Sequence, residues 1–346
     1  MVLQATSVSK TFAAGRTGFG RTRVSAVDNV SLNVRRGESL GIVGESGCGK
    51  TTLARMLVGL ERPDSGRIEV AGRDIASLRG SGRRLLSRDV QMVFQDPYSS
   101  LNPRLTVYDI VTEPLRVHGV GGSSAARRVR AAELLSLVNL SPDMMTRFPH
   151  QFSGGQRQRI GIARAIALEP RVLVCDEPVS ALDVSVQAQV VNLLRSLQRR
   201  LGIALVFIAH DLAVVRHISD RTAVMYLGQV VETASTAALF GDPSHPYTQA
   251  LLSASPEVDR SRRRSLGQRI MLGGDPPSPT DPPSGCRFHT RCLFATSICA
   301  EQVPPVVELS SGHVALCHHT DQAREQRGRS PELAAAETTE TAPRVG

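Results

Sequence analysis

The sequence predicts a doubly wound α/β fold, in which helices cover both faces of a largely parallel sheet. Residues 172–175 and 204–208 are short apolar runs of the kind that form buried parallel strands. They alternate with two stretches of helical periodicity, residues 155–168 and 186–201. A further apolar run, residues 40–43, leads into a glycine-rich turn and then into a helix. This alternation of strand and helix is typical of a sheet wound on both sides.

Each expected element has a local signal. Pro63 and Pro170 end the first and third helices, because proline cannot continue a helix. Arg199 and Arg200 close the last helix, where cations interact favourably with its dipole. The expected elements are strands at residues 27–34, 40–43, 90–94, 172–175 and 204–208 and helices at residues 50–60, 125–140, 155–168 and 186–201.

Length and composition limit the possible classes of protein. A chain of 346 residues corresponds to about two domains at the usual domain size. With 41% hydrophobic and 21% charged residues, the composition is that of a globular protein without a membrane-spanning segment. The N-terminus lacks the charged and then apolar segments of a secretory signal, so we expect a cytosolic chain.

The net charge also bears on possible partners. There are 41 Lys and Arg against 32 Asp and Glu, a net charge of 41 − 32 = +9, which suits anionic ligands. The chain has 4 Tyr, 9 Phe and no Trp, and they do not interleave with a basic groove. We therefore expect no nucleic-acid binding, since base stacking needs aromatic platforms.

The chain divides into three parts by composition. Residues 1–255 hold the strand and helix signals. Residues 256–319 form a Pro-rich linker followed by a segment with four cysteines, and residues 320–346 are polar and expected to be disordered.

A phosphate-binding loop follows the strand at residues 40–43. The pattern G-x-x-x-x-G-K-[ST] is matched by Gly44, Glu45, Ser46, Gly47, Cys48, Gly49, Lys50 and Thr51. Backbone N–H groups of the loop and of the helix start, including Thr52, converge on phosphate oxygens in such a turn. Lys50 would neutralise the β- and γ-phosphates, and the Thr51 hydroxyl would bind Mg²⁺. The sequence therefore predicts ATP-type nucleotide binding.

Two further motifs complete the prediction. The strand at residues 172–175 ends in Asp176, a candidate Mg²⁺ ligand, and Glu177, a candidate general base that polarises water. A second anion-binding helix start is formed by Ser153, Gly154, Gly155 and Gln156. One nucleotide cannot readily occupy both helix starts of one chain, so we expect a dimer that shares each site between two subunits.

Taken together, these motifs resemble the ATP-binding subunits of ABC transporters over residues 1 to about 255. The phosphate loop, Gln95, the 153–156 motif, Asp176 with Glu177, the 180–183 motif that ends in Asp183, and His210 occur in that family's order. The resemblance implies a P-loop NTPase core of ABC type, an inserted helical subdomain at about 96–168 and a small irregular cysteine-containing C-terminal extension.

The same resemblance assigns further residues. It implies that Gln95 contacts Mg²⁺ and the membrane partner, and that Asp183 lies at the dimer seam. It implies that His210 contacts the γ-phosphate and positions the catalytic water. Phe12 resembles the aromatic that stacks on adenine, with Phe19 as a competitor.

Three segments narrow the subfamily. Residues 95–104, 177–187 and 245–252 are similar to oligopeptide/dipeptide importer ATPases, and nickel importers share much of this sequence. The resemblance implies an ATPase on the cytoplasmic face of the membrane with two transmembrane permease subunits and a second ATPase, in a homodimer or heterodimer. A solute-binding protein outside the membrane would act indirectly. The alternatives are a nickel importer, a soluble ABC-type ATPase acting on DNA or ribosomes, and a regulatory ATP switch that senses iron or oxygen.

The C-terminal segment contains a cysteine cluster. Cys286, Cys292, Cys299 and Cys317 are separated by 5, 6 and 17 residues. In a cytosolic chain such a cluster favours metal over disulfides, and four thiolates suit a [4Fe–4S] centre, as some members of the resembled subfamily hold. The alternatives are zinc, unligated thiols or disulfides, and the nearby His289 and His313 are expected to be surface residues.

Overall fold

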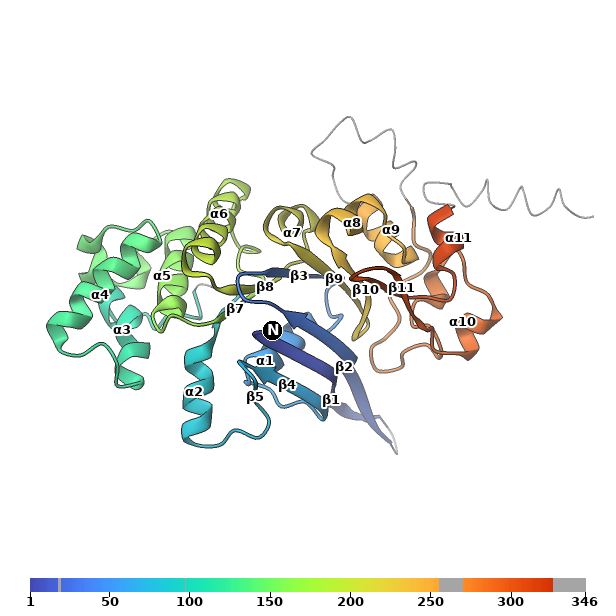
Figure 1. The fold of residues 1–346 in the computed structure, drawn as a ribbon, viewed down its shortest axis with the longest axis horizontal. Helices are drawn as coiled ribbons and strands as arrows, with labels where there is room; N and C mark the ends of the chain where they lie inside the picture. Colours follow the sequence, from blue (N-terminus) through green and yellow to red (C-terminus); the bar gives the residue numbers. More distant parts are fainter. Residues whose placement is uncertain (18–19, 97, 255–269, 326–346) are drawn as a thin grey trace, which may run out of the picture.

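The computed structural model describes residues 1–17, 20–96, 98–254 and 270–325. Two β-sheets and a set of helices form the fold (Figure 1). Among the described residues, the larger sheet has eight strands. In spatial order they are β6 (Val90–Val93), β7 (Val172–Asp176), β8 (Ala204–Ile208), β3 (Ser39–Val43), β9 (Arg221–Tyr226), β10 (Gln229–Ser235), β12 (His313–Leu316) and β11 (Val306–Ser310). The sheet is parallel from β6 to β9 and antiparallel from β9 to β11.

The central strands are buried on both faces, which explains their continuous apolar sequence. In β7, Val172 and Val174 pack into one core while Leu173 and Cys175 pack into the other. Strand β8 alternates in the same way. Because successive side chains of a strand point to opposite faces, an unbroken apolar run is needed to fill both cores. The prediction of strands at 172–175 and 204–208 is confirmed.

A smaller antiparallel sheet lies over one face of the larger sheet. Helix α1 (Lys50–Leu57) lies between the two sheets and packs against β7 and β8 of the larger one and β2 of the smaller one (Figure 1). The strands of the smaller sheet, in spatial order, are β2 (Gly20–Val34), β1 (Leu3–Thr17), β4 (Ser65–Val70) and β5 (Arg73–Asp74). The strand expected at residues 27–34 therefore lies in this second sheet rather than in the parallel core.

Helices α3 and α4 form a separate group with α5, and α5 also contacts β6 and α6 (Figure 1). Side-chain caps begin these three helices at Thr106, Ser123 and Ser153. Besides α1, the helices of the described residues are α2 (Ser81–Asp89), α3 (Val107–Val117), α4 (Ser124–Leu137), α5 (Gly154–Ile166), α6 (Val184–Leu201), α7 (Leu212–Ile218), α8 (Thr236–Gly241), α9 (Pro246–Ala254), α10 (Ser297–Glu301) and α11 (Thr320–Glu325). Short 3-10 turns are η1 (Pro142–Thr146), η2 (Pro149–Gln151) and η3 (His289–Arg291).

The C-terminal extension joins the larger sheet. Strand β12 pairs with β10, and β11 adds to β12. The expectation of disorder from residue 320 is wrong for residues 320–325, which form α11. This helix is held in place because Ala323 is buried and its carbonyl accepts a hydrogen bond from the Gln249 side chain. Residues 326–346, and most of the linker expected from residue 256, lie outside the described residues. In the described part of the chain, no helix is both long and apolar enough to span a membrane.

Candidate functional site

The phosphate loop connects β3 to α1, as the sequence predicts. Its glycines allow close packing that any side chain would prevent. A Cβ atom on Gly44 would lie 2.1 Å from the Met225 carbonyl oxygen, and one on Gly49, where φ is 104°, would lie 1.9 Å from the Ala26 carbonyl oxygen. The loop is therefore held tightly between the two sheets, with α1 starting directly behind it.

Lys50 is folded back onto this loop. Its Nζ donates to the carbonyl oxygens of Gly44 at 2.8 Å and Glu45 at 2.9 Å, and the residue is 5% exposed. A bound polyphosphate would offer oxygens to the same ammonium group. Lys50 can thus exchange two carbonyl partners for phosphate oxygens without leaving the loop.

Thr51 and Asp176, the two residues predicted to bind Mg²⁺, lie side by side. The Thr51 hydroxyl donates to Asp176 Oδ1 at 3.2 Å, and Asp176 is 3% exposed at the end of β7. Burial raises the pKa of Asp176, an effect that the hydrogen bond from Thr51 opposes. A hydroxyl and a carboxylate are the hard oxygen donors that Mg²⁺ prefers, so these residues fit the ion.

Glu177 lies beside Gln95 and His210. Gln95 Nε2 donates to Glu177 Oε2 at 2.9 Å, and His210 Nδ1 lies 3.8 Å from Glu177 Oε1. Glu177 has a φ of 45°, in the left-handed region, and its N–H donates to the Ile208 carbonyl at 3.0 Å. A non-glycine residue adopts that conformation only where its surroundings hold it. The structure thus brings these three predicted residues together at one sheet edge.

The second predicted anion site begins α5. Ser153 Oγ accepts from Gln156 N at 3.3 Å, and Gln156 Oε1 accepts from Ser153 N at 3.1 Å, which is a capping box. A Cβ on Gly155 would lie 2.4 Å from Val186 Cγ1, and one on Gly154 would lie 3.2 Å from a Leu182 methyl. These glycines therefore also allow α5 to pack closely on the start of α6, a role that the sequence did not reveal.

Two predicted residues lie at the surface. Asp183 precedes α6, is exposed and makes no side-chain cap. Phe12 lies on β1, is 38% exposed and has the Lys10 ammonium 5.4 Å from its ring centroid. Phe19, the competing aromatic, lies outside the described residues. The adenine-stacking role of Phe12 stays a prediction.

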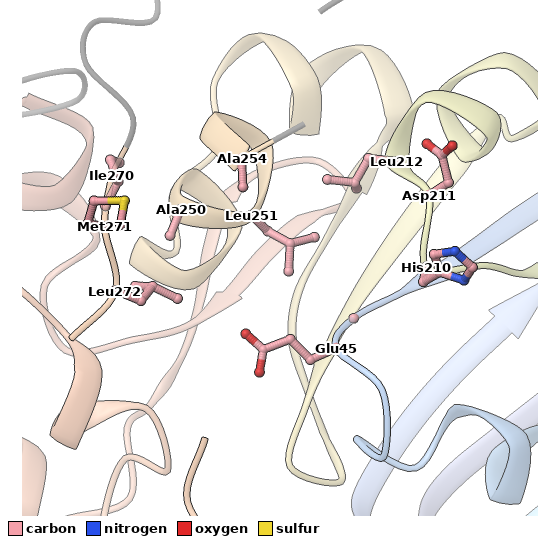
Figure 2. A pocket seen from close by; sticks show the side chains of 11 residues that line it. Glu45, His210, Asp211, Leu212, Ala250, Leu251, Ala254, Ile270, Met271 and Leu272 are labelled. Carbon is pink, nitrogen blue, oxygen red and sulfur yellow. The ribbon is translucent and has the colours of Figure 1, made fainter. Parts of the chain in front are cut away.

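A cavity of about 550 Å³ adjoins the phosphate loop (Figure 2). Gly44, Glu45 and His210 line one side, while Leu251 of α9 and Leu272 of the extension line the other. Figure 2 shows the Glu45 carboxylate pointing toward Leu272 and away from His210. The extension therefore approaches the nucleotide loop itself, which the sequence did not predict.

The contact with Glu45 is direct. Arg291 Nη1 donates to Glu45 Oε1 at 3.2 Å and Oε2 at 3.1 Å, and the Glu45 N–H donates to the Tyr247 hydroxyl at 3.0 Å. Arg287, four residues before Arg291, pairs with Asp28 at 2.6 Å. The extension thus joins both the phosphate loop and the smaller sheet.

Buried polar residues hold the extension in place. Glu232, 1% exposed, accepts hydrogen bonds from the backbone N–H groups of Ser244 at 2.7 Å and His245 at 3.0 Å. His313 Nε2 lies 2.8 Å from Glu232 Oε1. The expectation that His313 is a surface residue is wrong: it is 6% exposed, because β12 carries it into the interior beside Glu232.

The four tail cysteines are free thiols, with Cys299 and Cys317 buried and Cys286 and Cys292 partly buried. Burial, with a smaller contribution from neighbouring tail cysteines and against hydrogen bonds from the backbone N–H groups of Phe294 and His319, raises the pKa of Cys292 to about 12 and that of Cys317 to about 11. The four thiols are therefore near enough to interact electrostatically. Over the described ranges, however, no group of three or more His, Cys, Asp or Glu side chains is arranged to hold a metal ion.

The chain matches two known protein families. Residues 27–180 match the family described as "ABC transporter", and residues 231–299 match the "Oligopeptide/dipeptide transporter, C-terminal region". A "Probable peptide ABC transporter ATP-binding protein y4tS" of Sinorhizobium fredii is 54% identical over 85% of this chain and 82% of its own length. "Oligopeptide transport ATP-binding protein AppF" of Bacillus subtilis is 49% identical over 92% of this chain and 97% of its own.

Solved structures agree. The ATP-binding cassette MJ0796, a dimer in a post-hydrolysis state bound to ADP and Pi, is 30% identical with a TM-score of 0.60 and covers 68% of this chain and 98% of its own. The cbiO1 protein of Clostridium perfringens, part of the ABC transporter complex cbiONQ, is 27% identical with a TM-score of 0.60 over 70% of this chain and 91% of its own. The chain therefore belongs to the ABC transporter ATP-binding proteins, an ATPase family, and within it to the group with the oligopeptide/dipeptide transporter C-terminal region.

Proposed function

We propose that this ATPase powers the import of oligopeptides or dipeptides. The observation that carries the proposal is the grouping of Glu177, Gln95 and His210 beside the Thr51–Asp176 pair. That arrangement can hydrolyse ATP, and the names of the relatives supply the solute class. Nickel or another small solute is the alternative cargo.

Hydrolysis in this site depends on positioning and charge stabilisation. The phosphate loop and Lys50 bind the β- and γ-phosphates, and Thr51, Gln95 and Asp176 would hold Mg²⁺, which neutralises phosphate charge when bound. Glu177 accepts a proton from the attacking water, so that water adds to the γ-phosphorus as the bond to the ADP oxygen breaks. His210 contacts the γ-phosphate and orients the water.

The complete site needs a second ATPase subunit. Ser153, Gly154, Gly155 and Gln156, together with the exposed Asp183, would contact the nucleotide held by the partner's phosphate loop. The capping box at Ser153 supports this role because the serine oxygen accepts a bond and leaves its hydrogen free to donate. The second subunit is either another copy of this chain or a related ATPase.

Two transmembrane permease subunits would dock next to Gln95. A surface cavity of about 600 Å³ lies between the larger sheet and α3, and Phe94, directly before Gln95, lines it. Leu60, Phe94 and Val117 of its lining are 59%, 41% and 60% exposed, an apolar surface suited to a short helix of a membrane partner. Such docking gives the chain a peripheral position on the cytoplasmic face of the membrane, with a solute-binding protein acting from outside.

The first experiment is co-purification from membranes. The tagged chain, extracted in mild detergent, should bring two multi-span permease chains with it. The Val117→Asp variant should lose them, while Val129→Asp, which places the same charge at a 62% exposed valine of α4 outside this cavity, should retain them. Recovery with DNA or ribosomes instead of permeases would contradict the proposal. If the permeases are recovered, uptake assays with peptides and with nickel distinguish the two possible cargoes.

We also propose that Cys286, Cys292, Cys299 and Cys317 hold a [4Fe–4S] cluster. Support comes from four free, buried or partly buried thiols in one small extension, where the Cys286 N–H donates to the Cys299 carbonyl at 2.7 Å, since four thiols are a donor set that suits iron and sulfide. The thiols would have to move closer together and lose their protons to bind it. Anaerobic purification followed by iron and sulfide analysis should give four of each per chain, and a colourless, iron-free protein would refute the cluster.

A further inference from the structure

The phosphate loop contains a carboxylate whose role the catalytic scheme leaves open. Glu45 lies between Gly44 and Ser46, where the backbone binds phosphate, and the Lys50 ammonium contacts its carbonyl oxygen at 2.9 Å. A negative side chain at this position opposes the binding of a polyphosphate. Its charge must be compensated or directed elsewhere if ATP is to bind well.

Arg291 of the C-terminal extension supplies that compensation. Its Nη1 lies 3.2 Å and 3.1 Å from the two oxygens of Glu45. The Arg291 side chain is 8% exposed and that of Glu45 is 31% exposed, so water screens this pair less than an open surface pair. Burial alone would lower the pKa of Arg291, but its hydrogen bonds to Tyr226 and Glu45 raise it, and the cation persists.

A rigid aromatic group supports the pair. The Tyr226 hydroxyl accepts a bond from Arg291 at 3.4 Å, and the Tyr247 hydroxyl accepts the Glu45 N–H at 3.0 Å. The rings of Tyr226, Tyr247 and Phe288 are fully buried and lie 4.6 to 5.4 Å apart, centroid to centroid. Close packing fixes these hydroxyls, so both the backbone and the side chain of Glu45 are held from the extension side.

We propose that Arg291 is a positioning residue for ATP binding: it neutralises the Glu45 carboxylate and holds it on the extension side of the phosphate loop. Arg291 does not touch the phosphates and acts through Glu45. The extension thereby sets the nucleotide affinity of the loop. This inference requires that the loop binds MgATP, and the Lys50→Ala variant, which should not bind, tests that requirement separately.

The test is a double-mutant cycle on the full chain, with MgATP affinity measured by calorimetry. Arg291→Gln should raise the Kd for MgATP about 5- to 20-fold, because the freed carboxylate then faces the phosphates. Adding Glu45→Gln to that variant should bring Kd back to within about threefold of the parent, since the unpaired charge is gone. The turnover rate of Arg291→Gln at saturating MgATP should change less than about twofold, because Arg291 touches neither the phosphates nor Glu177.

Single variants make the test independent of how well Arg291→Gln folds. Glu45→Gln alone leaves an uncompensated cation near the loop, so MgATP should bind as tightly as in the parent or more tightly. Arg324→Gln is the matched control, because Arg324 ties the same extension to Asp242 instead of the phosphate loop. Its Kd should equal that of the parent.

Three results would overturn the proposal. They are an unchanged Kd in Arg291→Gln, a loss of affinity that Glu45→Gln does not restore, and weaker MgATP binding in Glu45→Gln alone. The second result would mean that Arg291 only anchors the extension.

Discussion

Acidification should weaken the attachment of the extension through one buried histidine. His245 is 1% exposed, and its Nδ1 accepts the Tyr247 N–H at 3.1 Å. The ring also hydrogen-bonds the backbone of Leu316 in β12, and because its Nδ1 accepts a bond the ring is neutral. Burial lowers the pKa of His245 to about 4, although the nearby Glu232 carboxylate and the bond to Leu316 oppose this shift.

The sign and size of the effect follow from linkage. The unfolded chain protonates His245 near pH 6.5, whereas the folded chain resists protonation down to about pH 4. Stability from this group is therefore complete above about pH 6.5 and is lost as the pH falls toward 4. Between pH 7 and pH 5 the loss amounts to roughly 2 kcal/mol.

Urea unfolding at pH 7 and pH 5 measures this term. His245→Asn cannot titrate, and its carbonyl can still accept the Tyr247 N–H. The fall in unfolding free energy between the two pH values should be smaller in this variant than in the parent by roughly 2 kcal/mol. His150→Asn, at an exposed histidine, is the control and should behave as the parent does. Equal pH dependence in His245→Asn and the parent would refute the reasoning.

Three further predictions test the site and its supports. Glu177→Gln should bind MgATP but hydrolyse it about 10²- to 10⁴-fold more slowly, because the water loses its base; near-normal turnover would contradict that role. Gly155→Ala places a Cβ 2.4 Å from Val186 Cγ1, so thermal unfolding should show a destabilisation of about 1–3 kcal/mol. An unchanged Tm would mean that α5 and α6 can move apart at no cost in stability. Glu232→Gln removes a buried carboxylate that has three hydrogen-bond partners, so the unfolding free energy should fall by about 2–4 kcal/mol. The tail thiols should then react faster with a thiol reagent. Glu301→Gln, at an exposed glutamate, is the control and should change neither quantity.

Local patterns explain what could be predicted from the sequence. Strand β7 is buried on both faces, so its apolar run is visible without knowing its neighbours. The phosphate loop is likewise local, because eight consecutive residues contain the whole pattern. The helix expected at residues 125–140 is α4, Ser124–Leu137, since its periodicity and its Ser123 cap lie within the segment.

Long-range partners explain what could not be predicted. Glu45 and Arg291 are 246 positions apart, and no local pattern around either residue indicates that the two form a pair. Strand β1 pairs with both β2 and β4, and the sequence alone does not show which strands pair to form the smaller sheet. His313 gives no sign of its burial, because its partner Glu232 lies on a strand 81 positions earlier.

The segment at residues 245–252 shows how a subfamily signature acquires a physical meaning. His245 bonds the backbone of β12, Tyr247 accepts the Glu45 N–H, and Gln249 donates to the Ala323 carbonyl of α11 at 2.7 Å. Three neighbouring residues thus connect a strand, the phosphate loop and the last described helix. Because Phe288 also packs into the main core, the extension completes the interior around the nucleotide loop rather than following it as a separate unit. A chain with the phosphate loop but without the extension would keep the bond from the Glu45 N–H to Tyr247 of α9 and would lose the pairing of the Glu45 carboxylate with Arg291, so in this chain the charge balance of the nucleotide loop depends on the C-terminal extension.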